Sequence, residues 1–260
     1  MGYTLVTGAS GVLGGEFCRQ LVLTDDLFLT GRSLEKLENL KNELISIRNT
    51  AKIYIFPADL TDFNEREKLF KFIDEKGIKF SGLINVAGAD IQKEFIKYTH
   101  EKITFQVRVN LEGTLAITHA VLKRREENLK ILTVSSMCGI TPMPYFAVYS
   151  ATKSSLINFF TSLRKEIKNA KITTLIPGSI PTREDVKKDI EIQGLTGKLS
   201  SCKPSFVVKK ALKGLEKNRA KVIPGAFNKL VCFFEKITPK SLRVRKIILD
   251  EVERKRANKK

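Results

Sequence analysis

The 260-residue sequence has no tryptophan, only two histidines and only four cysteines. The cysteines are far apart and form no Cys-x-x-Cys pair, which argues against a disulfide framework or a zinc site and favours reduced thiols in a cytoplasmic protein. These cysteines are Cys18, Cys138, Cys202 and Cys232. His100 and His119 have no histidine or cysteine neighbour at ligand spacing, so we predict no metal site.

Long apolar runs are also missing. The longest one near the C-terminus, residues 230–234, is far shorter than the ~20 residues that a membrane-spanning helix needs. The first strand-like run begins at Tyr3, which leaves no room for a secretory signal peptide, and we expect none.

Acidic residues are scarce, with 28 Asp and Glu against 46 Lys and Arg, and the net charge is +18. Such an excess suits nucleic acid, an anionic membrane or an anionic ligand. No helix-turn-helix, zinc finger or RNA-binding aromatic motif is present, so we predict no nucleic-acid partner.

Strand-like and helix-like segments alternate along the chain. The predicted strands are residues 3–7, 27–30, 53–56, 83–85, 130–134 and 172–176, and the predicted helices are 17–23, a segment that begins after an N-cap at Ser33, 65–76, 99–125 and 149–168. This alternation predicts an α/β fold of the Rossmann type, a doubly wound parallel sheet in a single domain over residues 1–225. Ligands of such sheets bind at the carboxyl ends of the strands.

Two segments depart from this pattern. Residues 179–204 are polar and interrupted by proline and glycine, which predicts an irregular segment that is either a lid or a disordered loop. Residues 226–260 carry a local charge excess and two apolar stripes on either side of Pro239, which predicts an extension of two amphipathic helices. We consider three roles for this extension: to cover the substrate cleft, to pack in an oligomer, or to lie on an anionic membrane surface.

A glycine-rich turn follows the first strand and opens the first helix, over residues 7–14. Glycines permit a tight turn and allow backbone N–H groups to approach a pyrophosphate at the helix N-terminus. The second strand ends at Thr30-Gly31-Arg32-Ser33 and has no acidic residue to bind the ribose 2′-hydroxyl of NAD. Arg32 can pair with a 2′-phosphate and Ser33 can add a hydroxyl donor, so we predict NADP(H) as the cofactor.

Tyr149 and Lys153 are four residues apart and share one face of a predicted helix. The pKa of a free phenol is about 10, and a nearby ammonium group favours the phenolate and lowers that value. Ser136 follows the fifth strand, and its hydroxyl can hold a substrate oxygen. Residues 142–146 lie just before Tyr149 and offer an apolar wall.

Taken in order, these motifs resemble those of the short-chain dehydrogenase/reductase family over roughly residues 3–225. The motifs are Thr7–Gly14, Asp59, Asn85–Gly88, Asn110, Ser136, Tyr149-x-x-x-Lys153 and Pro177-Gly178-x-x-x-Thr182. One departure is Val12, which gives the glycine turn the spacing TGxxGxxG in place of the TGxxxGxG of the compact branch. The overall length and the remaining motifs are similar to the compact, single-domain branch.

The resemblance implies a role for each matching residue. Tyr149 would be the general acid/base, Lys153 would bind the nicotinamide ribose and lower the pKa of Tyr149, Ser136 would polarise the carbonyl, and Asn110 would hold a water in the proton relay. The predicted cofactor contacts are Gly8, Ser10, Gly11, Val12, Leu13, Gly14, Arg32, Ser33, Asp59, Leu60, Asn85, Ala87, Gly88, Tyr149, Lys153, Pro177, Gly178, Ile180 and Thr182.

The implied function is an NADP(H)-dependent oxidoreductase that transfers a hydride between the nicotinamide and a ketone or alcohol, with reduction as the expected direction. Two alternatives stay open: a sugar-nucleotide-modifying enzyme, favoured by the glycine spacing, and a non-catalytic NADP-binding sensor or scaffold. We expect a small-molecule carbonyl or alcohol substrate, a homodimer or homotetramer as the resemblance implies, and a cytoplasmic protein with a peripheral membrane contact as an option for its basic extension.

Overall fold

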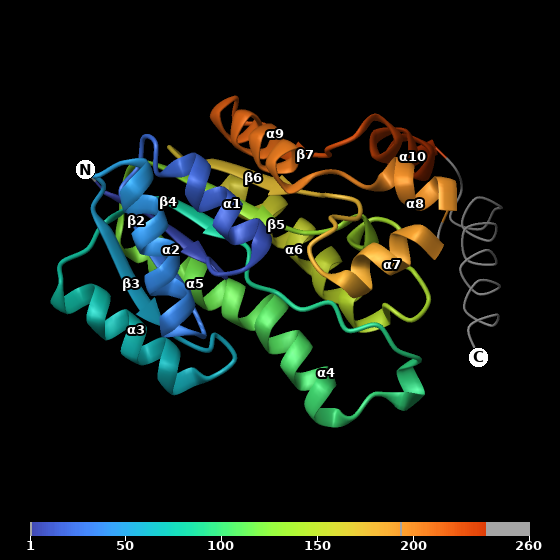
Figure 1. Ribbon diagram of the computed structural model, residues 1–260, viewed down its shortest axis with the longest axis horizontal. Coiled ribbons are helices and arrows are strands. Elements are labelled where there is room, and N and C mark those ends of the chain that lie inside the picture. Colours follow the sequence, from blue (N-terminus) through green and yellow to red (C-terminus); the bar gives the residue numbers. More distant parts are fainter. Residues whose placement is uncertain (1, 193, 238–260) are drawn as a thin grey trace.

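Seven parallel strands form one sheet in the computed structural model, which describes residues 2–192 and 194–237 (Figure 1). The strands are β1 (Tyr3–Thr7), β2 (Leu27–Gly31), β3 (Ile53–Pro57), β4 (Phe80–Asn85), β5 (Arg125–Val134), β6 (Lys171–Leu175) and β7 (Lys221–Val222). Their order is β3-β2-β1-β4-β5-β6-β7, so the chain winds outward from β1 to one edge and then from β4 to the other. This reversal confirms the predicted doubly wound fold and places a ligand crevice at the carboxyl ends of β1 and β4.

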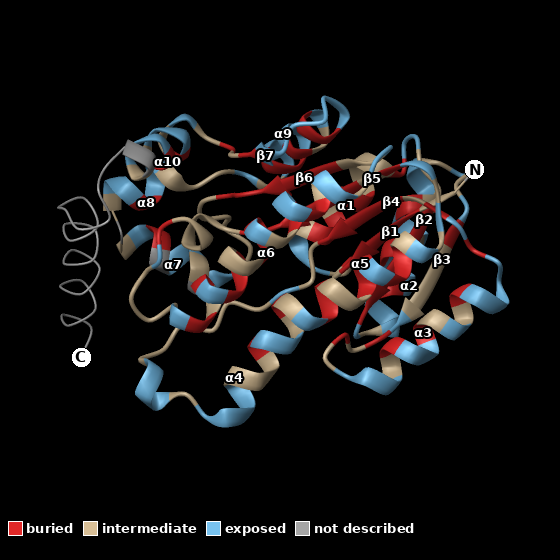
Figure 2. Ribbon diagram, turned by 180° about the vertical axis from the view of Figure 1, so that it is seen from behind, coloured by how far each residue is buried: buried red, intermediate tan, exposed pale blue. Residues whose placement is uncertain are grey.

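Helices cover both faces of the sheet (Figure 1). α1 (Val12–Leu21), α2 (Leu34–Ile47) and α9 (Pro204–Glu216) bury their apolar stripes against one face. α3 (Phe63–Glu75), α5 (Gly113–Lys123) and α6 (Ala147–Glu166) cover the other. Adjacent residues of β1 serve the two layers, because Leu5 belongs to the second core and Val6 to the first, as the two-residue period of a strand requires. Figure 2 shows the resulting burial of the central strands.

The predicted helix over residues 99–125 is interrupted. α4 (His100–Val107) continues through a π-helical turn, η2 (Arg108–Glu112), into α5. A π-helical turn adds a residue to the helical repeat and rotates the side chains that follow, and such turns occur often at functional sites. The other short helices are η1 (Phe95–Lys97) and η3 (Met137–Gly139).

The prediction of an irregular segment over residues 179–204 is wrong. α7 (Glu184–Ile192) and α8 (Gly194–Ser200) occupy most of it. Ile190 and Gly197 are buried, so the two short helices gain from tertiary packing what their polar sequence does not supply by itself.

The predicted C-terminal extension begins with α10 (Ala226–Ile237), whose inner face carries the buried residues Asn228 and Cys232. Its predicted second helix, after Pro239, lies outside the described residues. No helix in the described part of the chain is both long and apolar enough to cross a membrane.

Candidate active site

The glycine-rich turn leaves no room for side chains. Gly8 has a φ of +62°, and a Cβ there would lie 3.0 Å from Ala87. A Cβ on Gly14 would lie 2.1 Å from the carbonyl oxygen of Gly8. Gly11 caps α1 without a side-chain acceptor, so the first N–H groups of that helix are available to an anion. The non-glycine residue of the motif, Val12, is 48% exposed and points away from this packing, which explains why the unusual spacing is accommodated.

Polar side chains gather where β2 ends. Arg32 is exposed there, and Ser33 caps α2 as predicted, because its Oγ accepts a hydrogen bond from the Lys36 N–H at 3.3 Å. The Oγ of Ser10 lies 3.1 Å from the position that a Cβ on Gly31 would take. An arginine and two hydroxyl groups therefore lie at the carboxyl edge of the sheet, where a phosphate group fits their chemistry.

Tyr149 and Lys153 lie on successive turns of α6, and the Lys153 Nζ is 5.7 Å from the centre of the Tyr149 ring. Ser136, which follows β5, lines the same cavity as Tyr149, and its hydroxyl acts to lower the pKa of the phenol. Lys153 is buried and donates to the carbonyl oxygen of Val134 at 2.9 Å. The structure thus brings the phenol, the ammonium group and the serine hydroxyl together at one cavity, as the sequence predicted.

Asn110 is buried in the π-helical turn. Its Oδ1 accepts from the Ala89 N–H at 2.7 Å, and its Nδ2 donates to the Ala89 carbonyl at 2.9 Å and to Thr152 at 3.1 Å. A Cβ on Gly88 would lie 3.0 Å from Asn110 Oδ1 and 3.3 Å from Lys153 Nζ. The asparagine therefore holds the loop after β4 against α6, beside the lysine.

Burial sets the proton affinities of the central pair. It raises the pKa of Tyr149 well above its ordinary value, with Cys138 and Asp90 adding to the rise and the Ser136 hydroxyl and Arg183 opposing it. Burial also lowers the pKa of Lys153 to about 8, against a smaller opposing effect of Asp90. The expectation that Lys153 lowers the pKa of Tyr149 is not met in this structure, because loss of solvent dominates for both groups.

Three further predicted cofactor residues lie at or just after the ends of β3 and β4 and make contacts within the protein. Asn85 is buried beneath the sheet edge, and its Nδ2 donates to Thr118 at 3.1 Å and Thr133 at 3.3 Å. Asp59 accepts from the N–H and hydroxyl of Thr61, and Leu60 is buried. Asn85 therefore braces the sheet edge from below, while Asp59 orders the turn after β3.

A cavity of about 640 Å³ is lined by Ser136, Tyr149 and Lys153. Eight of the predicted cofactor contacts line it, namely Leu13, Gly88, Tyr149, Lys153, Pro177, Gly178, Ile180 and Thr182. An apolar part of the lining, called the apolar wall below, includes Met143 and Phe146 of residues 142–146, together with Val186 and Ile190 from α7 and Phe227 and Val231 from α10. Asp90 and Arg183 also line it, and the sequence analysis missed both because no motif marks them.

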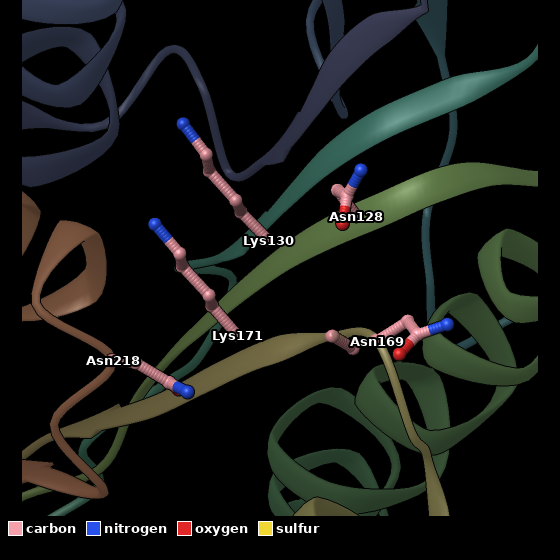
Figure 3. Close-up of a pocket in the computed structure, with 6 residues that line it drawn as sticks. Asn128, Lys130, Asn169, Lys171 and Asn218 are labelled. Atoms are coloured by element: carbon pink, nitrogen blue, oxygen red, sulfur yellow. The ribbon is translucent and has the colours of Figure 1, made fainter.

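A second hollow lies at the amino ends of β5 and β6, away from the catalytic residues. Figure 3 shows Lys130 and Lys171 extending side by side from neighbouring strands. Both ammonium groups pair with Glu216, at 2.7 and 3.4 Å. The shared carboxylate compensates much of their charge, so the hollow has the character of a solvated ion-pair cluster.

The sheet topology and the polar cluster at its carboxyl edge place this chain among the Rossmann-type oxidoreductases, which use NAD or NADP. Within that class, the chain belongs to the short-chain dehydrogenase family, whose sequence model (short chain dehydrogenase) matches residues 3–191.

Known proteins agree with this placement. A very-long-chain 3-oxoacyl-CoA reductase of Neurospora crassa is 34% identical over 175 residues, which cover 64% of this chain and 52% of the relative. The 11-beta-hydroxysteroid dehydrogenase-like 2 of Arabidopsis thaliana is 29% identical over 246 residues, 90% of this chain and 77% of the relative. The chain spans about half the length of the first curated relatives it matches.

Solved structures share the fold. One from a study of 7beta-hydroxysteroid dehydrogenase stereoselectivity has a TM-score of 0.79 at 19% identity and covers 97% of this chain and 96% of its own. A short-chain dehydrogenase from Sphingobium yanoikuyae in complex with NADPH has a TM-score of 0.75 at 19% identity, with 94% and 99% covered.

Proposed function

We propose that this protein is an NADPH-dependent reductase of apolar ketones, with Tyr149 as the proton donor. The observation that carries the proposal is that Ser136, Tyr149 and the buried Lys153 line one cavity, with the Lys153 ammonium group next to the Tyr149 ring. The two hydroxyl groups can bind one carbonyl oxygen, so that Ser136 polarises it and Tyr149 delivers the proton. The bound nicotinamide supplies the hydride.

The raised pKa of Tyr149 fits the reductive direction. A phenol that keeps its proton at neutral pH is ready to donate it to a developing alkoxide. Lys153 lines the cavity, where it can meet a ribose hydroxyl, and Asn110 holds the neighbouring loop through its bonds to Ala89. Gly8, Gly11 and Gly14 give a phosphate access to the N-terminus of α1.

The apolar wall of the cavity favours a ketone on a long or fused hydrocarbon frame. The named relatives include a 3-oxoacyl-CoA reductase and a hydroxysteroid dehydrogenase-like protein. Acyl chains are long hydrocarbon frames and steroids are fused ones, so both names fit this substrate class. The sequence also left open a sugar nucleotide as substrate. A polar sugar does not complement the apolar wall, which includes Met143, Phe146, Ile190 and Phe227.

The test is oxidation of NADPH over a panel of 3-oxoacyl thioesters, steroid ketones and sugar nucleotides. Tyr149→Phe removes only the phenol oxygen, and we expect it to bind NADPH normally and to lose about a hundredfold or more in kcat. Tyr54→Phe, in the aromatic cluster at β3, is the matched control and keeps full activity. A Tyr149→Phe enzyme with normal turnover contradicts the mechanism, whereas an unmodified protein that binds NADPH but turns over no compound of the panel leaves the binding-protein alternative.

NADP over NAD rests on Arg32 and on the absence of an acidic residue at the end of β2. Arg32→Glu replaces the phosphate partner by an acceptor for a ribose hydroxyl, so we expect the preference measured by calorimetry to shift from NADP toward NAD. Lys68→Glu makes the same charge change on the exposed side of α3 and serves as the control. Equal affinities for the two cofactors in the unmodified protein contradict the proposal.

We also propose that the protein is cytoplasmic, makes a peripheral contact with anionic membranes and forms a homo-oligomer. Exposed apolar residues cluster on the neighbouring helices α8 and α10, with Lys198 and Lys229 exposed among them. The apolar members are Leu195, Leu199, Leu230, Phe233 and Phe234. This patch of apolar and basic residues suits a bilayer surface.

Flotation with anionic vesicles tests the membrane contact, and light scattering during size-exclusion chromatography tests the oligomer. Phe233→Ser reduces vesicle binding, whereas Phe63→Ser on the exposed side of α3 does not. Equal binding by both variants contradicts the contact through α10.

A further inference from the structure

Asp90 and Arg183 form an ion pair within the catalytic cavity, with Arg183 Nη1 at 2.8 Å from Asp90 Oδ1. They are 93 residues apart in sequence, because Asp90 lies in the loop after β4 and Arg183 directly precedes α7. Both line the cavity, and their side chains are 34% and 52% exposed. Lys153 is the third charged residue of the cavity wall, and the proposed function already uses it.

The ion pair joins two segments of the chain that line the cavity. One is the loop after β4, which Asn110 fixes through its two hydrogen bonds to Ala89. The other is α7, which supplies Val186 and Ile190 to the apolar wall. A second ion pair of α7, between Lys187 and Glu184, lies within that helix and connects it to nothing else.

The segment just before Arg183 carries two of the predicted cofactor contacts. Ile180 and Thr182 line the cavity, and the Thr182 N–H donates to the Ile180 carbonyl at 2.7 Å, so this segment is a tight turn. The Lys187 N–H donates to the Arg183 carbonyl, which makes Arg183 part of the first turn of α7. A displacement of Arg183 therefore moves the turn at Ile180–Thr182 and α7 together.

We propose that Asp90 and Arg183 are positioning residues whose ion pair holds α7 and the preceding turn over the catalytic cavity. The inference deepens the proposed function, because it assigns to this pair the retention of cofactor and the placement of substrate. The loop after β4 is the fixed anchor, and α7 is the part that the pair holds in place.

Both members of the ion pair also affect the pKa of the Tyr149 phenol. Asp90, from the loop after β4, raises the pKa of Tyr149, and Arg183, before α7, lowers it. The other groups that act on the phenol are Cys138, which raises its pKa, the Ser136 hydroxyl, which lowers it, and Lys153 beneath the ring on α6. Loss of one member of the ion pair therefore shifts the pH profile in one direction, and loss of the other shifts it in the opposite direction.

The experiment compares Arg183→Gln, Asp90→Asn and their combination with Arg183→Lys, which keeps the charge. Hydrogen exchange of residues 184–192 reports on α7 without any need for activity. We expect about two- to fivefold faster exchange in both single variants, no further increase in the combination, and partial protection in Arg183→Lys, as for a partly exposed ion pair. Arg124→Gln is the control, because it breaks the two-bonded pair with Asp74 outside the cavity.

Binding and kinetics follow in the same proteins. We expect both single variants to weaken NADPH binding by a similar factor, while the pH profile of alcohol oxidation moves to lower pH in Asp90→Asn and to higher pH in Arg183→Gln. A merely structural defect would move both profiles the same way or not at all. Unchanged exchange over residues 184–192 in both variants overturns the proposal. If the exchange responds but the unmodified protein binds no NADPH, the pair holds α7 as proposed and the proposed function fails.

Discussion

The buried lysine makes a prediction about stability that can be worked out from the structure. Lys153 is 4% exposed, and loss of solvent lowers its pKa from the ordinary 10.5 to about 8. The unfolded chain therefore binds more protons than the folded one between these two values, and stability rises with pH through this interval. The cost of folding with this lysine is fully present below about pH 8 and is gone above about pH 10.5.

The magnitude follows from the shift. At about 1.4 kcal/mol for each pKa unit, the lowered pKa corresponds to a penalty of roughly 3 kcal/mol near pH 7 and about half of that near pH 9.5. Lys153→Met removes this penalty but also removes the hydrogen bond to the Val134 carbonyl, which costs about 1–3 kcal/mol at any pH. The difference in unfolding free energy between the two proteins therefore changes by roughly 2 kcal/mol over this range, and that change isolates the titration of Lys153.

Urea denaturation of both proteins without cofactor, at about pH 7 and about pH 9.5, measures this change. We expect the unmodified protein to gain stability relative to Lys153→Met as the pH rises. A difference that stays constant refutes the argument, since the lysine would then have the same pKa in both states. A difference that moves the opposite way would mean that the folded state favours the charged form.

Two further predictions concern packing. Gly14→Ala places a methyl group 2.1 Å from the Gly8 carbonyl oxygen, so we expect a loss of about 1–3 kcal/mol in stability and weaker NADPH binding by calorimetry, whereas the neighbouring Gly15→Ala, with its closest contact at 3.4 Å, has little effect on either. Asn228→Leu removes the donors to the Ser200 and Pro224 carbonyls, at 2.9 and 2.8 Å, and we expect a loss of about 1–3 kcal/mol in urea denaturation together with a raised KM, because α10 then lies less firmly against the cavity. Unchanged midpoints in the Gly14 and Asn228 variants would contradict this view of the packing.

The alternation of apolar runs and amphipathic segments was enough to predict the parallel sheet and the edge at which ligands bind. Six of the strands were predicted near their observed positions, and the two-residue β7 was missed because so short a strand has no period to detect. The helices α7 and α8 were missed because their formation depends on burial of Ile190 and Gly197, which no local propensity reveals.

The residues of the site also fall into two groups, those that the sequence could reveal and those that only the folded structure brings together. The motif residues Ser136, Tyr149 and Lys153 could be found in the sequence, because each has a fixed place in a strand-end loop or on one helix face. Asp90 and Arg183 carry no motif, and only the crossing of the loop after β4 with the start of α7 brings their charges to 2.8 Å.

The sequence by itself determined the class of fold, the glycine turn and the set of candidate catalytic groups, because these depend on local periodicity and on residue types at fixed spacing. The tertiary structure alone decided the π-helical turn at Asn110, the buried position of Asn85 and the proton affinities of Tyr149 and Lys153. These features depend on solvent exclusion and on contacts between segments that are far apart in the chain, which no single stretch of sequence contains.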